Sequence, residues 1–239
     1  MTELQNTSPV AIVTGGSRGF GRALAAALLS RGWTVVTDAR RIADLEATAG
    51  ALDSPRLIAI AGDVTDASHR AALLDAASHA GSLSLLVNNA SRLGPSPLPE
   101  LANYADDELR AVYDVNVFAP LALIRASLFA LAETRGVIVN LSSDAAVEAY
   151  QGWGGYGSSK AALDQMSAIL AVETPSVRVY AFDPGDMRTE MHQAAFPGED
   201  ISDRPEPESV VPALLRLVDT RPPGGRYRSS DLAVNGAPR

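Results

Sequence analysis

Apolar positions along this chain fall into two alternating patterns: short continuous runs, and longer stretches in which they recur with helical spacing. Most of the short runs end at glycine, asparagine or aspartate, which is typical of buried strands that lead into turns. Strands are predicted at 10–13, 34–37, 57–61, 83–87, 137–141, 177–182 and, more weakly, 232–234.

The stretches between these runs are rich in alanine and leucine and predict helices. Asp66 supplies an N-cap for one of them, and Pro120 predicts a kink in the longest. Helices are predicted at 20–31, 42–52, 66–79, 104–131, 156–173 and 209–218, with a short one after Thr189.

The alternation of strand and helix predicts an α/β fold with a doubly wound parallel sheet of about seven strands. Helices are expected on both faces, because continuously apolar strands need cover on each side. We expect a single domain over residues 1–239, since no linker or repeat divides the chain. Residues 1–8 form a polar N-terminal tail, and 186–208 is a candidate for a mobile substrate lid.

Composition and charge narrow the function classes. The net charge of −8 disfavours nucleic acid and anionic membranes as partners, because the chain would repel both. The chain has no cysteine, which excludes disulfides, thiolate metal sites and a cysteine nucleophile, and no metal site is predicted. It shows neither a signal-peptide pattern nor an unbroken apolar run long enough to span a bilayer. We therefore expect a cytoplasmic enzyme.

The count of one residue type is more specific. Of the 20 lysines and arginines, only Lys160 is a lysine. A lysine ammonium is compact and has three rotatable donors, and the fork of a guanidinium does not reproduce that geometry. A lone lysine in an arginine-rich chain indicates a position that arginine cannot fill.

The first predicted strand leads into a glycine-rich turn. Glycine lets the backbone turn sharply and approach a pyrophosphate, which then lies at the N-terminus of the next helix. Glycine turns also serve packing alone, but the position of this one, between the first strand and an Ala-rich helix, favours a dinucleotide site. Its residues are Thr14, Gly15, Gly16, Ser17, Arg18, Gly19, Phe20 and Gly21.

A second group of residues has the spacing of a catalytic site. Tyr156 and Lys160, four residues apart, share one face of a predicted helix, and Ser143 follows the strand at 137–141. A cation beside a phenol stabilises the phenolate, so Lys160 is predicted to lower the pKa of Tyr156. Such a tyrosine can exchange a proton with an alcohol or carbonyl oxygen held by the serine. Alternatively, Tyr156 is a half-buried aromatic residue and Lys160 a surface charge.

Together these motifs resemble the short-chain dehydrogenase/reductase family in its compact single-domain form, over roughly residues 10–236. The resemblance implies a Rossmann fold and hydride transfer between a nicotinamide cofactor and a carbonyl compound or secondary alcohol. The matching segments stand in the family's order: TGGSRGFG at 14–21, Asp63-Val64, Asn88-Asn89-Ala90, Val115-Asn116-Val117, Ser142-Ser143, Tyr156 to Lys160, and Pro184-Gly185 with Thr189.

The resemblance implies a role for each matching residue. Tyr156 would be the general acid/base, Ser143 would orient the substrate oxygen, and Lys160 would lower the pKa of Tyr156 and bind the nicotinamide ribose. Asn116 would hold a water in a proton relay through Lys160. The other matching residues would bind the cofactor: Gly15, Ser17, Arg18, Gly19, Phe20 and Gly21 in the turn, Asp63 and Val64 at the adenine, Asn89 and Ala90 along the wall, and Pro184, Gly185 and Thr189 at the carboxamide.

Simpler roles remain open for several of these residues. Asp63 can merely end a strand, Asn88 and Asn89 can form turns, Asn116 can bond backbone within its helix, and Thr189 can be an N-cap. The chain also departs from the family pattern, because Ser91 stands where glycine normally follows the Asn-Asn-Ala segment. Tyr180 replaces a usual asparagine, and the connection at 174–176 is short.

The end of the second strand bears on the choice of cofactor. An acidic residue at the strand tip would accept from a ribose 2′-hydroxyl and repel a 2′-phosphate. We align the tip with Ala39, which leaves Arg40 and Arg18 to hold a 2′-phosphate and favours NADP(H). NAD(H) is the alternative if Asp38 occupies the tip, because neighbouring strand residues point to opposite sides.

The predicted walls of the substrate site, at 91–95, 145–153 and 187–196, are mostly apolar. They favour an apolar or aromatic ketone, aldehyde or secondary alcohol as the small-molecule substrate. His192 lies near this region and is expected to face solvent rather than act as a base. Ala- and Leu-rich helices beginning at Tyr104 and Tyr156 are expected, by resemblance, to form the contact of a homodimer or homotetramer.

Two other function classes are considered. The chain can be an NADP(H)-binding redox sensor or regulatory subunit without turnover, or an assembly subunit. The complete set of Ser143, Tyr156, Lys160 and Asn116 argues against both, since neither function needs a tuned tyrosine. An epimerase or dehydratase on the same fold would usually carry a larger C-terminal substrate region.

Overall fold

The structure, a computed structural model, describes residues 8–232. At its centre, seven parallel strands form one sheet in the order β3-β2-β1-β4-β5-β6-β7. This confirms the predicted α/β fold with a doubly wound parallel sheet. The strands are β1 (Pro9–Val13), β2 (Thr34–Ala39), β3 (Leu57–Ala61), β4 (Ser82–Asn88), β5 (Val137–Leu141), β6 (Arg178–Asp183) and β7 (Gly225–Arg228).

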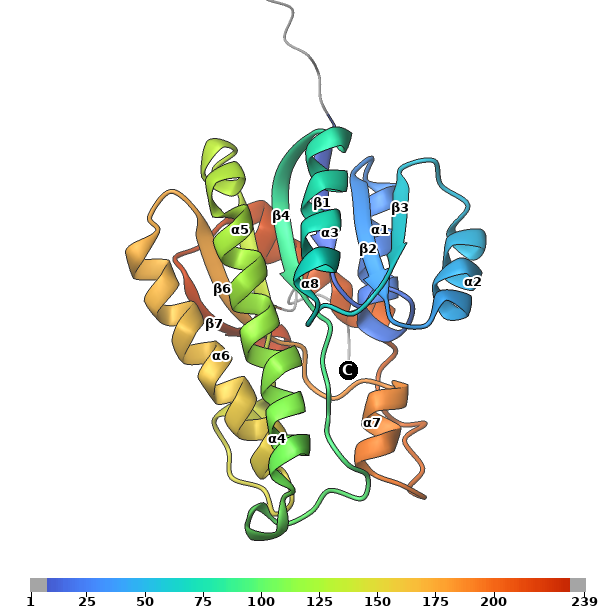
Figure 1. Cartoon of the computed structure of the whole chain (residues 1–239), viewed down its shortest axis with the longest axis vertical. Coiled ribbons are helices and arrows are strands. Elements are labelled where there is room, and N and C mark those ends of the chain that lie inside the picture. The colour runs from blue at the N-terminus through green and yellow to red at the C-terminus, as the bar shows by residue number, and fades with distance from the viewer. Residues whose placement is uncertain (1–7, 233–239) are drawn as a thin grey trace, which may run out of the picture.

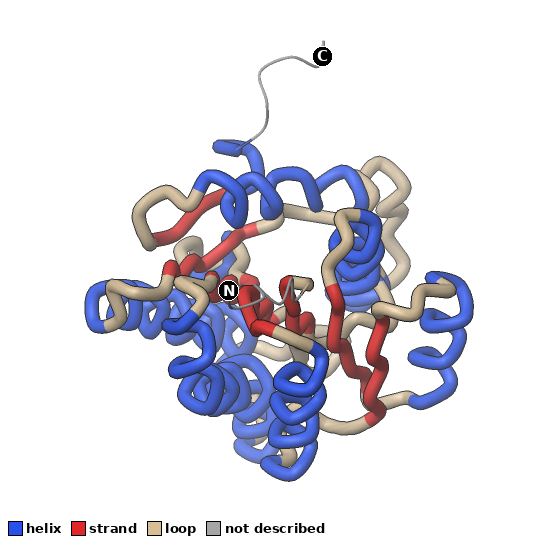
Figure 2. The backbone as a smooth tube through the Cα atoms, turned by 90° about the horizontal axis from the view of Figure 1, so that it is seen from above, coloured by secondary structure: helices blue, strands red, loops and turns tan. Residues whose placement is uncertain are grey.

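Helices cover both faces of the sheet (Figures 1 and 2). They are α1 (Gly19–Ser30), α2 (Ile42–Leu52), α3 (Ala67–Ala80), α4 (Asp106–Tyr113), α5 (Ala119–Glu133), α6 (Gly154–Glu173), α7 (Glu190–Ala195) and α8 (Pro207–Thr220). On one face α1 and α8 pack against strand residues such as Val13 and Phe182. On the other face α3 and α5 pack against residues such as Ile12 and Ile138. Neighbouring residues of one strand thus enter opposite cores, which explains the continuously apolar strand sequences.

The last strand lies earlier in the chain than predicted. β7 pairs with β6 from Tyr180 to Asp183, whereas the prediction placed a strand at 232–234. Leu232 instead ends a 3-10 turn, and residues 233–234 lie outside the described residues, as does most of the predicted tail at 1–8. The strand was missed because its sequence, GRYR, contains no apolar run. As an edge strand it is held by pairing with β6 and by the ion pairs of its arginines.

The long helix predicted at 104–131 is interrupted near the middle. A π-helical turn over Asp114–Phe118 separates α4 from α5. Pro120 has no N–H to offer the carbonyl of Asn116, four residues earlier, which explains why the helical register changes at this point. The irregular turn thus lies where Pro120 predicted a departure from a regular helix, and it contains Asn116.

This helical run is also the most apolar part of the chain. Asp106–Glu133 is long and apolar enough to cross a membrane by length and composition, with a mean hydropathy of 1.8 over its most apolar part. In the folded chain it is a core helix, because α5 packs Leu123, Ile124 and Leu131 into the hydrophobic core on that face of the sheet.

The strand order reverses between β1 and β4. In a doubly wound sheet the loops leaving the two strands at such a reversal diverge, and a crevice opens at the carboxyl ends of the strands. The loops after β1, β4, β5 and β6 meet at this edge, and α7 lies beside it (Figure 1).

Candidate active site

The loop after β1 brings its backbone very close to neighbouring segments. Gly15 has a φ of +69°, in the left-handed region, and a Cβ there would lie 3.0 Å from the Ala90 Cα. A Cβ on Gly21 would lie 2.4 Å from Asn89 Nδ2 and from the Gly15 carbonyl oxygen. Glycine alone fits these positions, so the turn packs closely against the loop after β4 and leads into the N-terminus of α1, a place suited to a pyrophosphate.

Asn89 joins the loop after β4 to this turn. Its Nδ2 donates to the carbonyl oxygens of Thr14 and Gly15 over 2.7 and 3.1 Å. Thr14 Oγ1 in turn accepts from the backbone N–H groups of Asn89 and Ala90, each over 3.0 Å. Asn89 was predicted to line the cofactor or to form a turn, and the structure shows that its side chain also holds the glycine turn in shape.

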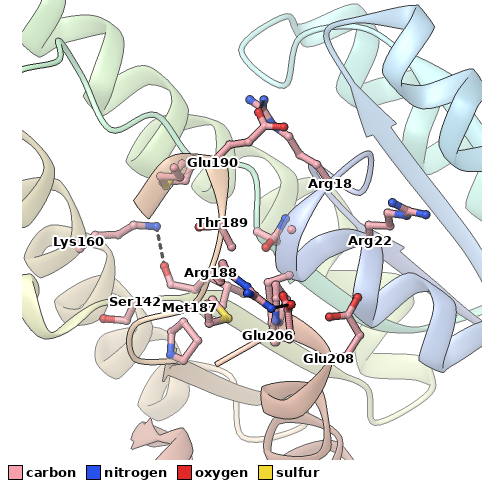
Figure 3. Close-up of a pocket in the computed structure, with 18 of the residues that line it drawn as sticks. Arg18, Arg22, Ser142, Lys160, Met187, Arg188, Thr189, Glu190, Glu206 and Glu208 are labelled. Carbon is pink, nitrogen blue, oxygen red and sulfur yellow. Dashed lines mark hydrogen bonds and ion pairs between the residues drawn. The ribbon is translucent and has the colours of Figure 1, made fainter. Parts of the chain in front are cut away.

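A cavity of about 420 Å³ runs from the glycine turn to α6. In Figure 3, Lys160 and Ser142 lie on one side of it and Arg18 and Arg22 on the other. An adjoining cavity of about 120 Å³ lies by the ends of β2 and β3. Residues predicted to bind the cofactor line both cavities. The larger one is lined by Arg18, Gly19, Phe20, Asn89, Tyr156, Lys160, Pro184 and Thr189. The smaller one is lined by Gly15, Ser17, Arg18, Arg40, Asp63, Val64, Asn89 and Ala90.

Asp38, on which the cofactor prediction depended, is 1% exposed and occupied by protein partners. Its Oδ1 accepts from the Gly15 N–H over 2.7 Å, and its Oδ2 lies 2.9 Å from His69 Nε2. Ala39 follows it and is only partly buried, and Arg40 is exposed beside it at the smaller cavity. The Asp38 carboxylate therefore stabilises the glycine turn through its hydrogen bond with the Gly15 N–H.

Asp63 and Val64 lie just beyond β3 at the same cavity. Asp63 Oδ1 accepts from the Thr65 N–H over 2.9 Å and from Thr65 Oγ1 over 2.8 Å. Burial acts to raise the pKa of Asp63, but these two hydrogen bonds and the nearby Arg40 and His69 together outweigh it and hold the pKa below its ordinary value. The carboxylate is thus ionised at neutral pH and able to accept from an amino group.

Tyr156 and Lys160 lie on the buried face of α6. The Lys160 side chain is buried, and its Nζ lies 5.5 Å from the centroid of the Tyr156 ring. Nζ donates to the Leu141 carbonyl oxygen over 2.7 Å, the dashed line of Figure 3. The alternative that the lone lysine is a surface charge is therefore excluded.

Burial dominates the ionisation of this pair. It raises the pKa of Tyr156 well above the ordinary value; a hydrogen bond with Ser91 lowers it, and the charges of Asp183 and Asp144 raise it further. Burial also lowers the pKa of Lys160 to about 8. The net pKa of Tyr156 is therefore raised, where a lowered one was expected, because the cost of burying a phenolate is the largest contribution. With its pKa raised, Tyr156 is protonated at neutral pH.

Ser143 stands at the start of a 3-10 turn after β5. Its Oγ donates to Asp144 Oδ1 over 2.9 Å and accepts from the Ala145 N–H over 3.2 Å. Ser143, Asp144 and Tyr156 line a third cavity, of about 110 Å³, beside the first. The fold therefore brings the predicted serine to the tyrosine, with Asp144 as its hydrogen-bond acceptor.

Asn116 is fully buried in the π-helical turn. Its Oδ1 accepts from Ser91 Oγ over 3.1 Å and from the Arg92 N–H over 2.8 Å. Its Nδ2 donates to the Arg92 carbonyl oxygen and to Ser159 Oγ, each over 2.9 Å. These four partners satisfy the amide, so a water of the predicted relay would have to bind the backbone carbonyl of Asn116 instead.

A charge cluster beside the predicted catalytic residues was not predicted. Arg226 of β7 pairs with Asp164 over 3.0 Å and with Asp183 over 2.8 Å, and it donates to the Ser143 carbonyl oxygen over 2.9 Å. Asp164 follows Lys160 by four residues, so the helical spacing that singled out Lys160 also pointed to it. Nothing in the sequence around Arg226 indicates that it reaches the site.

The third cavity lies under α7. Thr189 is the N-cap of α7, as foreseen, and its Oγ1 accepts from the His192 N–H over 3.2 Å. His192 was predicted to face solvent, but its side chain is only 10% exposed and lines the cavity, because α7 folds back over the site. The apolar residues of the cavity wall are Leu93, Trp153, Pro184, Gly185, Met187 and Met191.

Comparisons with known proteins agree with this geometry. The chain matches the family model for short chain dehydrogenase over residues 9–200. Sepiapterin reductase from Mus musculus is 33% identical over 228 residues, covering 86% of this chain and 83% of that protein. Serine 3-dehydrogenase from Agrobacterium fabrum is 35% identical over 183 residues, which cover 75% of this chain and 72% of that protein. A short-chain dehydrogenase from Shigella flexneri, solved in complex with NADP, superposes with a TM-score of 0.84 at 27% identity. The superposition covers 93% of this chain and 97% of that chain.

Proposed function

This chain belongs to the short-chain dehydrogenase family, and we propose that it transfers a hydride between NADP(H) and a carbonyl compound or secondary alcohol. One observation carries the proposal: Tyr156, Lys160 and Ser142 share with the glycine turn a cavity of about 420 Å³. The turn itself suits a dinucleotide, because it leads into the N-terminus of α1 and its Gly15 and Gly21 pack too closely against Ala90 and Asn89 to carry a side chain.

The bound nicotinamide would supply or accept the hydride. In reduction, Tyr156 donates its phenolic proton to the carbonyl oxygen, which completes the alcohol once the hydride has reached carbon. Its raised pKa keeps that proton in place until the oxygen becomes basic. Ser143 orients the same oxygen by turning its hydroxyl from Asp144 to the substrate. Lys160, anchored on the Leu141 carbonyl, holds the ribose hydroxyls and stabilises Tyr156 when it gives up its proton.

We propose NADP(H) rather than NAD(H) on the strength of the hollow beside the glycine turn. Ser17, Arg18, Arg40 and Arg41 line it, and its one carboxylate, Asp44, pairs with Arg41 over 2.6 Å. Guanidinium groups are well suited to a 2′-phosphate. The Asp38 carboxylate, which would favour a ribose hydroxyl, is already taken by Gly15 and His69.

We also propose that a single domain over residues 1–239 carries the cofactor site and the substrate site, that the protein is cytoplasmic, and that residues 186–208 close over the substrate. We further propose a homodimer or homotetramer through α5 and α6, where Phe129 is 79% exposed and Val172 81% exposed. Sedimentation of Phe129→Asp against the control Ile42→Asp, a residue 60% exposed on α2, tests this contact. Dissociation of the first variant alone is expected.

The test of function is NADPH oxidation, with NADH in parallel, over a panel of ketones and aldehydes. Tyr156→Phe should lose about 100-fold to 10,000-fold in kcat, the usual contribution of a general acid, and still bind NADPH. Tyr113→Phe is the matched control, because its hydroxyl bonds only Ser158 in the described part of the chain. Tight cofactor binding without turnover in either direction would instead favour a redox sensor, the alternative function.

A further inference from the structure

The third cavity holds a polar atom that the protein itself does not satisfy. His192 Nε2 is buried and has no hydrogen-bond partner in the described residues. The side chain is nine-tenths buried, and its ring lies 4.8 Å from that of Phe196, centroid to centroid. Leaving such a nitrogen unpaired is unfavourable, so a substrate group that bonds to it would bind more tightly.

The orientation of the ring indicates what kind of group this is. His192 Nδ1 faces Asp186, with Oδ1 at 3.8 Å. Of the two neutral tautomers, a carboxylate on that side favours the one with its proton on Nδ1, which leaves Nε2 as an acceptor. The partner of Nε2 is therefore a donor, such as a hydroxyl or an amino group.

The charges around the cavity also favour a substrate group that donates a hydrogen bond. Asp144, Asp183 and Asp186 line it, and no lysine or arginine is among its lining residues. Asp183 is engaged by Arg226, and Asp186 lies 3.5 Å from Arg204. Asp144 accepts from neutral groups, the Ser143 and Tyr150 hydroxyls and the Ala145 N–H. Its negative charge therefore acts on the cavity, which repels an anionic substrate and attracts a cationic one.

We propose that His192 is a specificity-determining residue, and that the substrate is an amino- or hydroxy-substituted ketone, or the matching alcohol, whose second polar group donates to His192 Nε2. The apolar wall of Leu93, Trp153 and Met191 accommodates the body of the molecule. An anionic keto acid is excluded by the carboxylates. This inference rests on the proposed function, because it assigns the substrate class of the same site.

The test compares acetophenone, α-hydroxyacetophenone, α-aminoacetophenone and benzoylformate. All four are aryl ketones, and they differ in the group on the other side of the carbonyl. The wild type should show a kcat/KM about tenfold or more higher for the hydroxy and amino ketones than for acetophenone, as for one buried hydrogen bond. Benzoylformate should be the poorest of the four.

His192→Phe keeps a ring against Phe196 but removes the nitrogen, so kcat/KM for the hydroxy and amino ketones should fall to about that for acetophenone. His192→Gln, which can place an acceptor near the same point, should recover part of the preference. His79→Phe is the matched control, since His79 lies on α3 with its side chain 77% exposed. Circular dichroism on each variant verifies that the fold is intact.

The outcomes separate the two proposals. Turnover of all four ketones without preference, or a preference that His192→Phe leaves unchanged, overturns the role of His192 and leaves the oxidoreductase intact. A preference for benzoylformate overturns the substrate class. No turnover of any ketone, or of the corresponding alcohols in reverse, with either cofactor overturns both proposals.

Discussion

Ser91 Oγ donates to Asn116 Oδ1 over 3.1 Å and also bonds the Tyr156 hydroxyl, where it lowers the pKa of the phenol. A serine at this position, in place of the glycine expected from the resemblance, thus joins the buried amide of the π-helical turn to the proposed acid. The fold converts a one-residue departure in the loop after β4 into a contact with the reacting group.

Ser91→Ala should therefore change the ionisation of Tyr156. The Ser91 hydroxyl, which donates to Asn116 while Tyr156 is protonated, can turn to donate to the phenolate. Losing this donor raises the pKa of Tyr156, so alcohol oxidation, which needs the deprotonated form, should require a higher pH. One hydrogen bond is worth about 1 kcal/mol, so the limb of the kcat profile on which oxidation rises with pH should move up by about 0.5 to 1 pH unit. Ser91→Thr, which keeps the hydroxyl, should behave like the wild type. Identical pH profiles for all three proteins would contradict the assignment.

Lys160 should limit cofactor binding at alkaline pH. Burial lowers its pKa to about 8 in the folded chain, so its positive charge is present below that pH and lost above it. The Kd for NADPH should therefore rise as pH increases through about 8. Lys160→Arg should bind more weakly but without this pH dependence, since a guanidinium stays protonated. Titration by protein fluorescence measures both, and a flat wild-type profile from pH 7 to pH 9.5 would rule the role out.

The same lowered pKa has a consequence for stability. Between about pH 8 and the ordinary lysine value of 10.5, the unfolded chain binds a proton at Lys160 that the folded chain does not. This group alone thus makes the free energy of unfolding increase with pH over that window. Subtracting the pH dependence of Lys160→Met from that of the wild type, in urea denaturation, isolates its contribution.

Ala39→Asp should reduce the preference for NADPH. The new carboxylate would lie beside Arg40 at the hollow proposed for the 2′-phosphate, repelling the phosphate and accepting from a ribose hydroxyl. We expect the ratio of kcat/KM with NADPH to that with NADH to fall by about tenfold to a hundredfold, as for a charge-assisted hydrogen bond. Ala39→Asn has the same shape without the charge and should shift the ratio far less. An equal shift in both variants would point to shape rather than charge.

Arg226→Met should destabilise the fold strongly. It would leave the buried carboxylate of Asp183, whose side chain is 4% exposed, without its closest cation. Breaking a buried pair in this way costs about 3–5 kcal/mol of unfolding free energy. Arg31→Met is the control, because Arg31 and Asp219 are 40% and 50% exposed and such a pair is worth about 1 kcal/mol or less. Urea denaturation measures the free energy of unfolding of both variants. Similar decreases in the two would show that the Arg226 cluster stabilises the fold no more than an exposed ion pair does.

Much of the local structure followed from short-range patterns. The bounds predicted for 42–52, 57–61 and 137–141 coincide with α2, β3 and β5. Asp66 caps α3 by accepting from the Ser68 N–H over 3.0 Å, as its position before an apolar-periodic stretch indicated. These features depend on residues a few positions apart, which is the range over which sequence periodicity carries information.

The sequence by itself determined the alternation of strands and helices, the glycine turn after the first strand, and the common helix face of Tyr156 and Lys160. The tertiary structure alone decided that Asp38 turns toward His69, that His192 lies under α7, and that Arg226 reaches Asp164 across 62 residues of sequence. It also reversed the expected direction of the Tyr156 pKa. The physical reason is that spacing along a helix or strand sets which residues share a face, whereas burial, desolvation and ion pairing depend on atoms that only the folded chain brings together.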